Sequence, residues 1–283
     1  MANYIKNYKL AISLTIKTLY KSKISSLLHF DFKKTNIFKK RIKSLLKNKN
    51  LLTKKNPFKN ERIAVYTVLF GDYDSIKNIN CNDRNCDFYI ITDQSIPKNS
   101  KWKQKHFAFP KSINTNVLKN RYLKMHPHLM FPDYKYSLYI DAFLGINFPP
   151  SFLLPRLGKN LIGAYSHEET RNCIYDEALT VVKANKDSRT KVMYQIERYK
   201  KEGFPKHFGL FENNILLRNH NDSKCVAIME DWWQEFSNGK QSKRDQLSLM
   251  YVIWKHGMTK CNISTLGYGY YDDPMFYALD HNK

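Results

Sequence analysis

The sequence predicts an α/β fold in which a mostly parallel sheet carries helices on both faces. Short runs of β-branched and aromatic residues alternate along the chain with segments of helical hydrophobic period. The first three runs are each followed by an acid, namely Asp74, Asp93 and Asp141. Strands that alternate with helices form largely parallel sheets, which bind ligands beyond the carboxyl ends of the strands. The three acids therefore mark the expected position of a site.

The predicted elements follow one another from residue 63 to residue 256. The first strand, IAVYTVLF, ends in a Gly-Asp-Tyr-Asp turn signal, and Asn114 is the expected cap of a helix that Pro127 ends. The expected strands are residues 63–70, 88–92, 137–140, 161–165 and 214–217. The expected helices are residues 114–126, 169–182, 191–201, 223–236 and 244–256.

Positive charge is concentrated at the start of the chain. The 283 residues carry a net charge of +22, and residues 1–60 hold 16 Lys and Arg against one acid, Asp31. We therefore expect a basic arm and linker over residues 1–60 and a folded domain over residues 61–283. Basic arms attract polyanions, either nucleic acid or an anionic membrane. An AT-rich codon bias is an alternative source of part of the charge.

The arm contains two amphipathic stretches, around residues 12–20 and 37–46, in which apolar residues recur at helical spacing among lysines. Basic amphipathic helices lie in membrane interfaces, and the alternative is a helical hairpin packed on the domain. No stretch reaches the roughly 20 apolar residues of a spanning helix, and no signal cleavage site follows. Five sparse cysteines favour a reducing compartment. We expect a cytoplasmic protein bound peripherally to the inner face of the membrane.

Motif searches exclude several enzyme classes. The sequence has no P-loop, GxGxxG, HExxH or GxSxG pattern, and the pair Cys81 and Cys86 lacks a second pair for a structural zinc site. Arg121 and Lys124, three residues apart, share one helix face close to the strand that ends at Asp141. Two cations beside a carboxylate suit a diphosphate and its divalent ion. The alternative is a solvated helix face.

Three further groups have alternative interpretations. His167 and Arg171 follow the strand at 161–165, where an exposed helix start would also explain them. Asp245 opens the last helix and alternatively serves only as its N-cap. Of the adjacent Trp232 and Trp233, one is expected in the core and one in a groove, and the alternative is a dedicated sugar platform.

Five ordered blocks carry a family resemblance. They are VYTVLFGDYDSIK (65–77), FYIITD (88–93), NRYLKMHPHLMFPDYKYSLYIDA (120–142), the pattern H-x3-R-x-C-x-Y-x-E-A (167–178) and RDQLS (244–248). Together they resemble a glycosyltransferase-like family, first catalogued as a domain of unknown function, that has bacterial members and plant members associated with pectin and mucilage synthesis. The blocks span about residues 62–257 and leave the basic arm outside.

The resemblance implies a GT-A-like fold: a Rossmann-type sheet that binds a nucleotide-sugar and usually a divalent metal, Mn²⁺ or Mg²⁺. Asp141 takes the place of the metal-binding Asp-x-Asp motif of that fold. Here Asp141-Ala142-Phe143 offers one carboxylate. Either a ligand such as a histidine from elsewhere completes the metal site, or cations stabilise the diphosphate without metal.

The resemblance also implies roles for individual residues. Asp93 would lie near the base or ribose, and Arg121 and Lys124 would face the diphosphate. Asp245 and Gln246 match an Asp-Gln motif beside the donor sugar, with Asp245 as the base or a sugar contact. The implied nucleotide pocket comprises Tyr66, Thr67, Phe70, Gly71 and Tyr73. The residues implied on the acceptor side, of which Glu177 is a further catalytic candidate, are His167, Glu169, Arg171 and Glu177.

These expectations combine into one function. Glycosyl transfer passes through an oxocarbenium-like state and needs a base at the acceptor and positive charge or metal at the leaving diphosphate. We expect an enzyme that transfers sugar from a nucleotide-sugar to a glycan or lipid-linked acceptor in surface polysaccharide synthesis, such as that of a capsule. Nucleic acid is not expected as a partner. The alternatives are a basic nucleic-acid-binding protein and a catalytically inactive scaffold.

Overall fold

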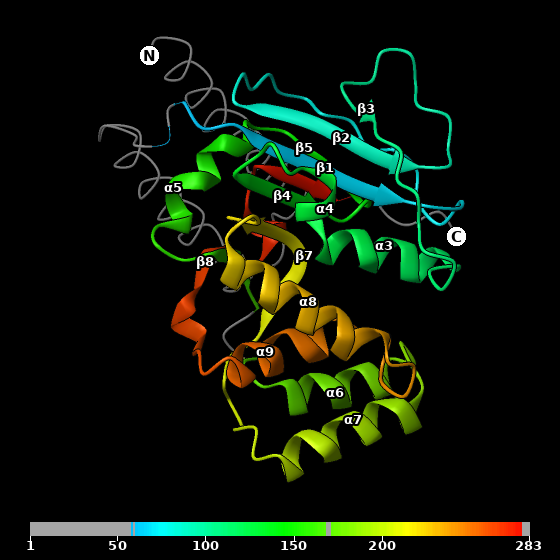
Figure 1. Ribbon diagram of the computed structural model, residues 1–283, viewed down its shortest axis with the longest axis vertical. Helices are drawn as coiled ribbons and strands as arrows, with labels where there is room; N and C mark the ends of the chain where they lie inside the picture. Colours follow the sequence, from blue (N-terminus) through cyan, green and yellow to red (C-terminus); the bar gives the residue numbers. More distant parts are fainter. Residues whose placement is uncertain (1–57, 59, 168–170, 279–283) are drawn as a thin grey trace, which may run out of the picture.

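The computed structural model describes residues 58, 60–167 and 171–278 and contains a seven-stranded mixed sheet (Figure 1). The strand order is β3-β2-β1-β4-β7-β6-β8, and β7 runs antiparallel to both of its neighbours. All the other pairs are parallel. The strands are β1 (Ile63–Leu69), β2 (Cys86–Thr92), β3 (Lys103–Gln104), β4 (Tyr136–Ile140), β6 (Ile162–Ser166), β7 (Phe211–Arg218) and β8 (Ile263–Tyr268). A second, small sheet pairs β5 (Leu144–Ile146) with β9 (Phe276–Ala278).

The longer helices gather on one face of the large sheet, below it in Figure 1. They are α3 (Asn116–Met125), α6 (Ile174–Lys183), α7 (Arg189–Lys201), α8 (Ser223–Ser237) and α9 (Gln246–Lys255), and the short α4 (Pro127–Met130) follows α3. The other face is covered by the small sheet and by the short helices η1 (Pro150–Leu153) and α5 (Leu154–Leu157). The turns η2 (Lys260–Asn262) and η3 (Tyr270–Asp272) flank β8. The expected α/β fold is confirmed, with unequal helical cover on its two faces.

The strand β1 lies at the centre of both cores because all seven of its residues are buried. Ala64, Tyr66 and Val68 pack against the helical face, whereas Ile63 and Val65 pack on the opposite face. A β-branched, two-sided apolar strand of this kind is typical of a central parallel strand. Its carboxyl end is thereby fixed between those of β2 and β4.

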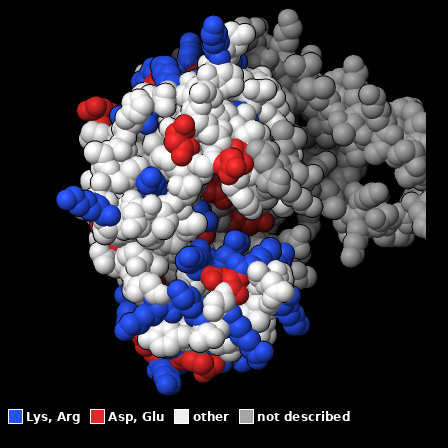
Figure 2. Space-filling model, turned by 90° about the vertical axis from the view of Figure 1, so that its right-hand side faces the viewer, with Lys and Arg blue, Asp and Glu red and all other residues white. Residues whose placement is uncertain are grey.

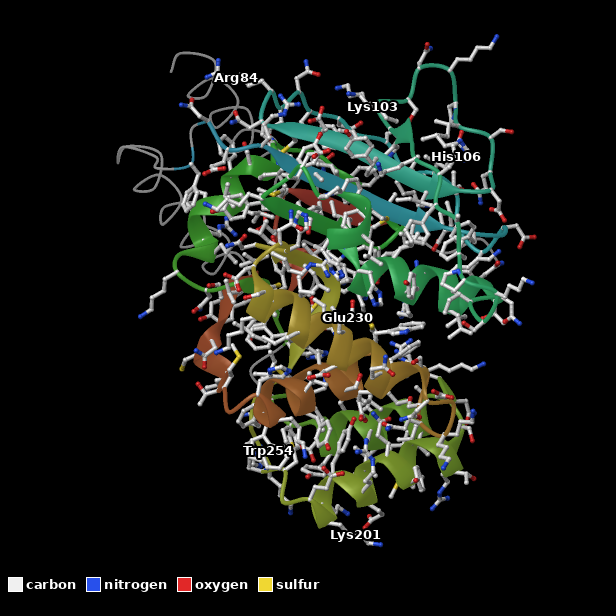
Figure 3. The ribbon with its side chains drawn as sticks, in the orientation of Figure 1. Arg84, Lys103, His106, Lys201, Glu230 and Trp254 are labelled. Carbon is white, nitrogen blue, oxygen red and sulfur yellow. The ribbon has the colours of Figure 1, made fainter. Side chains whose placement is uncertain are left out.

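A polar contact joins α8 to the segment that follows α3. Glu230 of α8, labelled in Figure 3, has carboxylate oxygens 3.3 Å from Nε2 of His126 and 3.1 Å from Nε2 of His128. The neighbouring Trp233 packs edge-on against Tyr122 of α3. Trp232 and Trp233 are both buried, so the prediction of one groove aromatic is wrong.

The predicted elements agree with the structure to within a few residues, apart from the start of the helix expected at 169, which begins at Ile174. Thr115, one residue after the predicted cap, accepts the Leu118 N–H and begins α3. The short strands β3, β5 and β9, and the strand β8, have no counterpart among the predicted elements. Nearly all of the predicted arm lies outside the described residues, so the arm and its boundary at residue 60 stay predictions. No helix in the described ranges has the length and apolar character needed to cross a membrane.

Candidate active site

Polar side chains meet at the edge of the sheet where β1, β4 and β6 end and β7 begins. The last turn of α3 adjoins this edge, because Lys124 forms an ion pair with Asp141 after β4. The start of α9 adjoins α3, because Asp245 forms ion pairs with Arg121 and Lys124. Figure 2 looks onto this side of the molecule and shows a hollow where acidic side chains lie among basic ones. The edge is the predicted ligand position for a sheet of this type.

A buried lysine connects the two acids of this edge. Nζ of Lys124 lies 2.6 Å from Oδ2 of Asp245 and 3.8 Å from Oδ1 of Asp141. Nε of Arg121 lies 3.5 Å from the same Asp245 oxygen. The side chain of Lys124 is 1% exposed and that of Asp245 is 8% exposed, whereas Arg121 and Asp141 are 20% and 23% exposed. Arg121 and Asp141 therefore present the solvent-facing charges of the cluster.

Two buried side chains, Tyr66 and Arg218, form hydrogen bonds with the backbone at Lys124. The Tyr66 hydroxyl lies 3.1 Å from the Leu123 carbonyl oxygen and 3.2 Å from that of Lys124. Arg218 donates to the Lys124 carbonyl at 2.6 Å and to the Tyr66 hydroxyl at 2.7 Å. Arg218 thereby places a cation at the carboxyl end of α3, where the helix dipole favours positive charge. Tyr66 is fully buried, so it supports the site from the core and does not line an open pocket.

Asp245 occupies the N-cap position of α9 but makes no capping hydrogen bond with its side chain. Its carboxylate is turned to Lys124 instead, so the alternative that Asp245 serves only as a cap does not hold. Trp232 donates from Nε1 to the Asp245 carbonyl at 3.3 Å and to Ser248 Oγ at 3.0 Å. The next residue, Gln246, donates to the carbonyl of the first residue of β7 at 3.0 Å. The start of α9 is thereby fixed against α8 and the sheet.

The charges of the cluster shift one another's protonation. Burial alone would raise the pKa of Asp245, but Arg121 and Lys124 outweigh it and hold that pKa well below its ordinary value. Burial lowers the pKa of Lys124, although Asp141 and Asp245 act in the opposite direction. An acid with so low a pKa stays ionised and accepts protons poorly, which suits a positioning role better than that of a base.

Asp141 lies beside two asparagines of β7 that the sequence analysis did not single out. Its carboxylate accepts the Tyr139 hydroxyl at 2.5 Å, and its backbone N–H donates to the Asn214 carbonyl at 2.8 Å. Residues directly opposite in an antiparallel pair have side chains on the same face. Both amide atoms of Asn213 and the Oδ1 of Asn214 are buried without a hydrogen-bond partner among the described residues. Buried polar groups normally have a hydrogen-bond partner, so these amides are candidates for contact with water, an ion or a ligand. The sequence signal was the pair of asparagines directly before the apolar run of β7.

The other residues implied for the nucleotide pocket lie around the end of β1. Asp93 accepts the Gly71 N–H at 3.0 and 3.2 Å from its two oxygens, which fixes the turn after the strand. Gly71 has φ +73°, a conformation that favours glycine. Thr67 is buried with its hydroxyl unpaired among the described residues, Phe70 is half-buried and Tyr73 is exposed.

Among the acceptor-side candidates, Glu177 is connected to the cluster through Arg244, which acts on both Glu177 and Asp245. Arg171 lies 3.3 Å from Glu177, and Arg244 lowers the pKa of both Glu177 and Asp245. Burial nevertheless raises the pKa of Glu177 above its ordinary value. His167 is buried at the end of β6, and Glu169 lies outside the described residues.

Asp141 and Asn214 offer oxygen ligands of the kind that Mg²⁺ and Mn²⁺ take. Within the described ranges, the one group of three side chains spaced to hold a metal ion is Cys173, Asp176 and His207, which does not include Asp141. No histidine of the described residues joins Asp141 in such a group.

A cavity of about 410 Å³ lies near the amino ends of β1 and β4, at the opposite edge of the sheet. It contains none of the predicted site residues. Its lining residues are Arg62, Tyr89, Lys105, Met130, Phe131, Asp133 and Tyr134.

Comparison with protein families gives one match. Residues 17–266 match the model of the TOD1/MUCI70 glycosyltransferase-like domain. The match begins within the basic arm, so the expectation that the arm lies wholly outside the family similarity is wrong. No curated protein matches the sequence.

Solved structures of glycosyltransferases resemble the chain at low identity. The bifunctional glycosyltransferase WbbM, in its apo form, matches at 13% identity and TM-score 0.45 over 74% of this chain and 39% of its own. GlyE of Streptococcus pneumoniae TIGR4 matches at 14% identity and TM-score 0.40, over 73% of this chain and 45% of its own. The apo form of mouse xyloside xylosyltransferase 1 matches at 11% identity and TM-score 0.39, over 72% of this chain and 84% of its own. This chain thus spans less than half of the first two.

Proposed function

Since the chain belongs to the TOD1/MUCI70 glycosyltransferase-like domain family, we propose that it transfers sugar from a nucleotide-sugar donor to a glycan or lipid-linked acceptor. The assembly of a surface polysaccharide such as a capsule is the proposed setting. The observation that carries the proposal is the charge cluster of Arg121, Lys124, Asp141 and Asp245 at the carboxyl edge of the sheet.

Arg121 is the proposed contact of the donor diphosphate. It is the more exposed of the two cations and lies beside Asp245 at 3.5 Å, so a second anion can reach its remaining N–H groups. Lys124 is buried between Asp141 and Asp245, so it would contribute positive potential at the diphosphate without direct contact. Positive charge that is fixed before the reaction stabilises a leaving diphosphate without reorganisation.

The residues proposed to hold a divalent ion are Asp141 and Asn214. A carboxylate and an unpaired amide oxygen on one face fit a hard cation, and diphosphate oxygens would complete its ligands. When bound, Mg²⁺ or Mn²⁺ would neutralise charge on the leaving group. Tyr139 orients the Asp141 carboxylate through its hydroxyl.

Glu177 is the proposed base toward the acceptor hydroxyl, and Asp245 is proposed to position the two cations. A carboxylate whose pKa is raised by burial accepts a proton more readily than one held ionised by two cations. His167 and Arg171 are proposed acceptor contacts. Asp93 and Gly71 are proposed to contact the nucleoside through the turn that they form.

The proposed location is the inner face of the membrane. Residues 1–60 are proposed to be an arm that holds the domain, residues 61–283, near anionic lipid. The reason is its charge, because the arm contains 16 Lys and Arg and only one acid. The arm would thereby bring the site close to a lipid-borne acceptor.

The test is donor turnover by the purified full chain. Nucleoside diphosphate released from UDP-, GDP- and ADP-sugars, and nucleoside monophosphate from CMP-sugars, is measured with Mg²⁺ or Mn²⁺ present. We expect one nucleotide class to be hydrolysed slowly, and Arg121→Ala to lower the rate by more than tenfold. Lys201→Ala, at an exposed position on α7, is the control and should retain the wild-type rate. Equal rates for Arg121→Ala and wild type would remove the assignment of the diphosphate site.

A further inference from the structure

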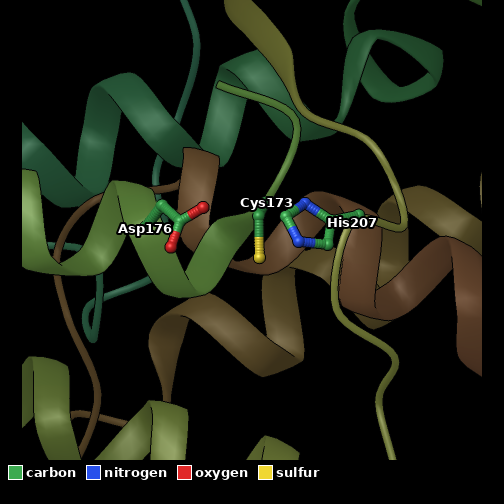
Figure 4. A group of neighbouring side chains, drawn as sticks. All are labelled: Cys173, Asp176 and His207. Atoms are coloured by element: carbon green, nitrogen blue, oxygen red, sulfur yellow. The ribbon is translucent and has the colours of Figure 1, made fainter. Parts of the chain in front are cut away.

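A second group of ligating side chains lies at the start of α6. The thiol of Cys173, the carboxylate of Asp176 and a ring nitrogen of His207 all lie within 4.8 Å of one another. Figure 4 shows the Cys173 sulfur between the His207 ring and the Asp176 carboxylate. Cys173 is buried, whereas Asp176 and His207 are exposed. The three residues come from two segments, the start of α6 and the loop between α7 and β7.

The His207 ring is held in an orientation that suits metal binding. Its Nδ1 lies 2.7 Å from the Asn172 amide oxygen, which can only accept, so Nδ1 carries the proton and Nε2 keeps a lone pair. Metal-ligating histidines usually have such an outer partner on the other ring nitrogen. The backbone of His207 is also fixed, at φ +56°, and the neighbouring Gly209 N–H donates to the Asn172 carbonyl at 3.0 Å.

The chemistry of the three ligands selects the metal. A thiolate is a poor ligand for Mg²⁺ and Mn²⁺, whereas a mixed set of sulfur, imidazole nitrogen and carboxylate suits Zn²⁺. With bonds of about 2.0–2.3 Å, a tetrahedral zinc ion holds its ligand atoms roughly 3.3–3.8 Å apart. The exposed side chains of Asp176 and His207 need to move only slightly to close on an ion.

We propose that Cys173, Asp176 and His207 form a zinc site distinct from the proposed donor site. Zinc there joins the start of α6 to the loop that leads into β7, and β7 carries Asn213 and Asn214. Three protein ligands leave one position for water. The proposal does not depend on the proposed transferase activity.

The experiment uses Co²⁺ as a spectroscopic probe on the full chain after treatment with a chelator. We expect one equivalent of Co²⁺ to produce a thiolate-to-cobalt charge-transfer band, and one equivalent of Zn²⁺ to abolish it. Zn²⁺ should also raise the melting temperature of the wild-type chain. His207→Ala and Cys173→Ser should lose the band, and Asn172→Ala should weaken Co²⁺ binding by about tenfold.

Matched controls remove a thiol or an imidazole elsewhere. Cys261→Ser and His106→Ala, both at exposed positions (His106 is labelled in Figure 3), should keep the band. We expect His207→Ala to fold, because the His207 side chain is exposed. Circular dichroism checks this expectation. A wild-type chain without the band would overturn the proposal, as would a band that persists in folded His207→Ala or that disappears in Cys261→Ser.

Discussion

At the residue scale, Asp245 and Lys124 form the central contact of the proposed site. Both side chains are nearly inaccessible to solvent, and their 2.6 Å ion pair is reinforced by Arg121 and Asp141. Removing one partner from a buried pair leaves the other charge uncompensated, which costs more than the pair itself contributes. The two positive and two negative charges of the cluster therefore stabilise one another, and the loss of one leaves another uncompensated.

Asp245→Asn is expected to destabilise the fold by about 3 kcal/mol, since Lys124 would keep only the more distant Asp141. Urea unfolding measures the change. Asp231→Asn is the matched control, because Asp231 is an exposed acid paired with His256, and its loss should cost below about 0.5 kcal/mol. Equal stability of the two variants would mean that the buried pair does not hold the site together.

Glu177→Gln tests the proposed base. We expect transfer to fall by about 100-fold or more while donor binding is retained. The deprotonated carboxylate is the active form, so wild-type activity should rise with pH through a pKa above the ordinary value of 4.5. That acid limb should disappear in the variant. Glu197→Gln, an exposed acid on α7, is the control. A variant with the wild-type pH profile would exclude Glu177 as the base.

At the element scale, β7 is the strand whose role was hardest to predict. The apolar run that follows Asn214 predicted a strand over residues 214–217, but no local pattern encodes its antiparallel direction, which pairing with β4 and β6 determines. That direction brings Asn213 and Asn214 beside the end of β4. The family resemblance placed Tyr66 in the pocket, but a strand pattern does not show which face of the sheet each residue covers, and Tyr66 is fully buried. The motif blocks include Arg121, Lys124, Asp141 and Asp245, and the fold brings these four residues together.

Asn214→Ala is expected to weaken nucleotide binding by about tenfold in the presence of Mn²⁺ and to leave the melting temperature of the free protein nearly unchanged. The reason is that the Oδ1 of Asn214 is unpaired among the described residues, so its removal breaks no contact there. Isothermal calorimetry measures the affinity. Asn238→Ala at the exposed end of α8 is the control. Unchanged affinity of Asn214→Ala would remove this residue from the proposed metal ligands.

At the scale of the whole molecule, charge separates the arm from the domain. Residues 61–283 hold 31 Lys and Arg and 24 acids, close to balance, while the arm is strongly basic. Because the family match begins at residue 17, deleting the arm would remove part of the matched region. Substitution of charges is therefore the sharper test of membrane binding.

Replacing Lys39, Lys40, Arg41 and Lys43 by Gln is expected to weaken binding to anionic vesicles by more than tenfold, since each basic residue contributes about 1 kcal/mol near such a surface. Co-sedimentation at low and high salt measures the effect. The control replaces four exposed basic residues of α6 and α7, namely Lys183, Arg189, Lys200 and Lys201. Equal loss in both variants would mean that net charge, and not the arm, drives the association.

The most direct test of the central claim is a thermal-shift panel of nucleotides and nucleotide-sugars on the full chain, with and without Mn²⁺ or Mg²⁺. A ligand that binds only the folded state raises its melting temperature. We predict stabilisation by one nucleoside diphosphate class, lost in Asp141→Ala and retained in Asp231→Asn. No shift with any nucleotide, together with stabilisation by duplex DNA, would contradict the account and favour a nucleic-acid-binding protein.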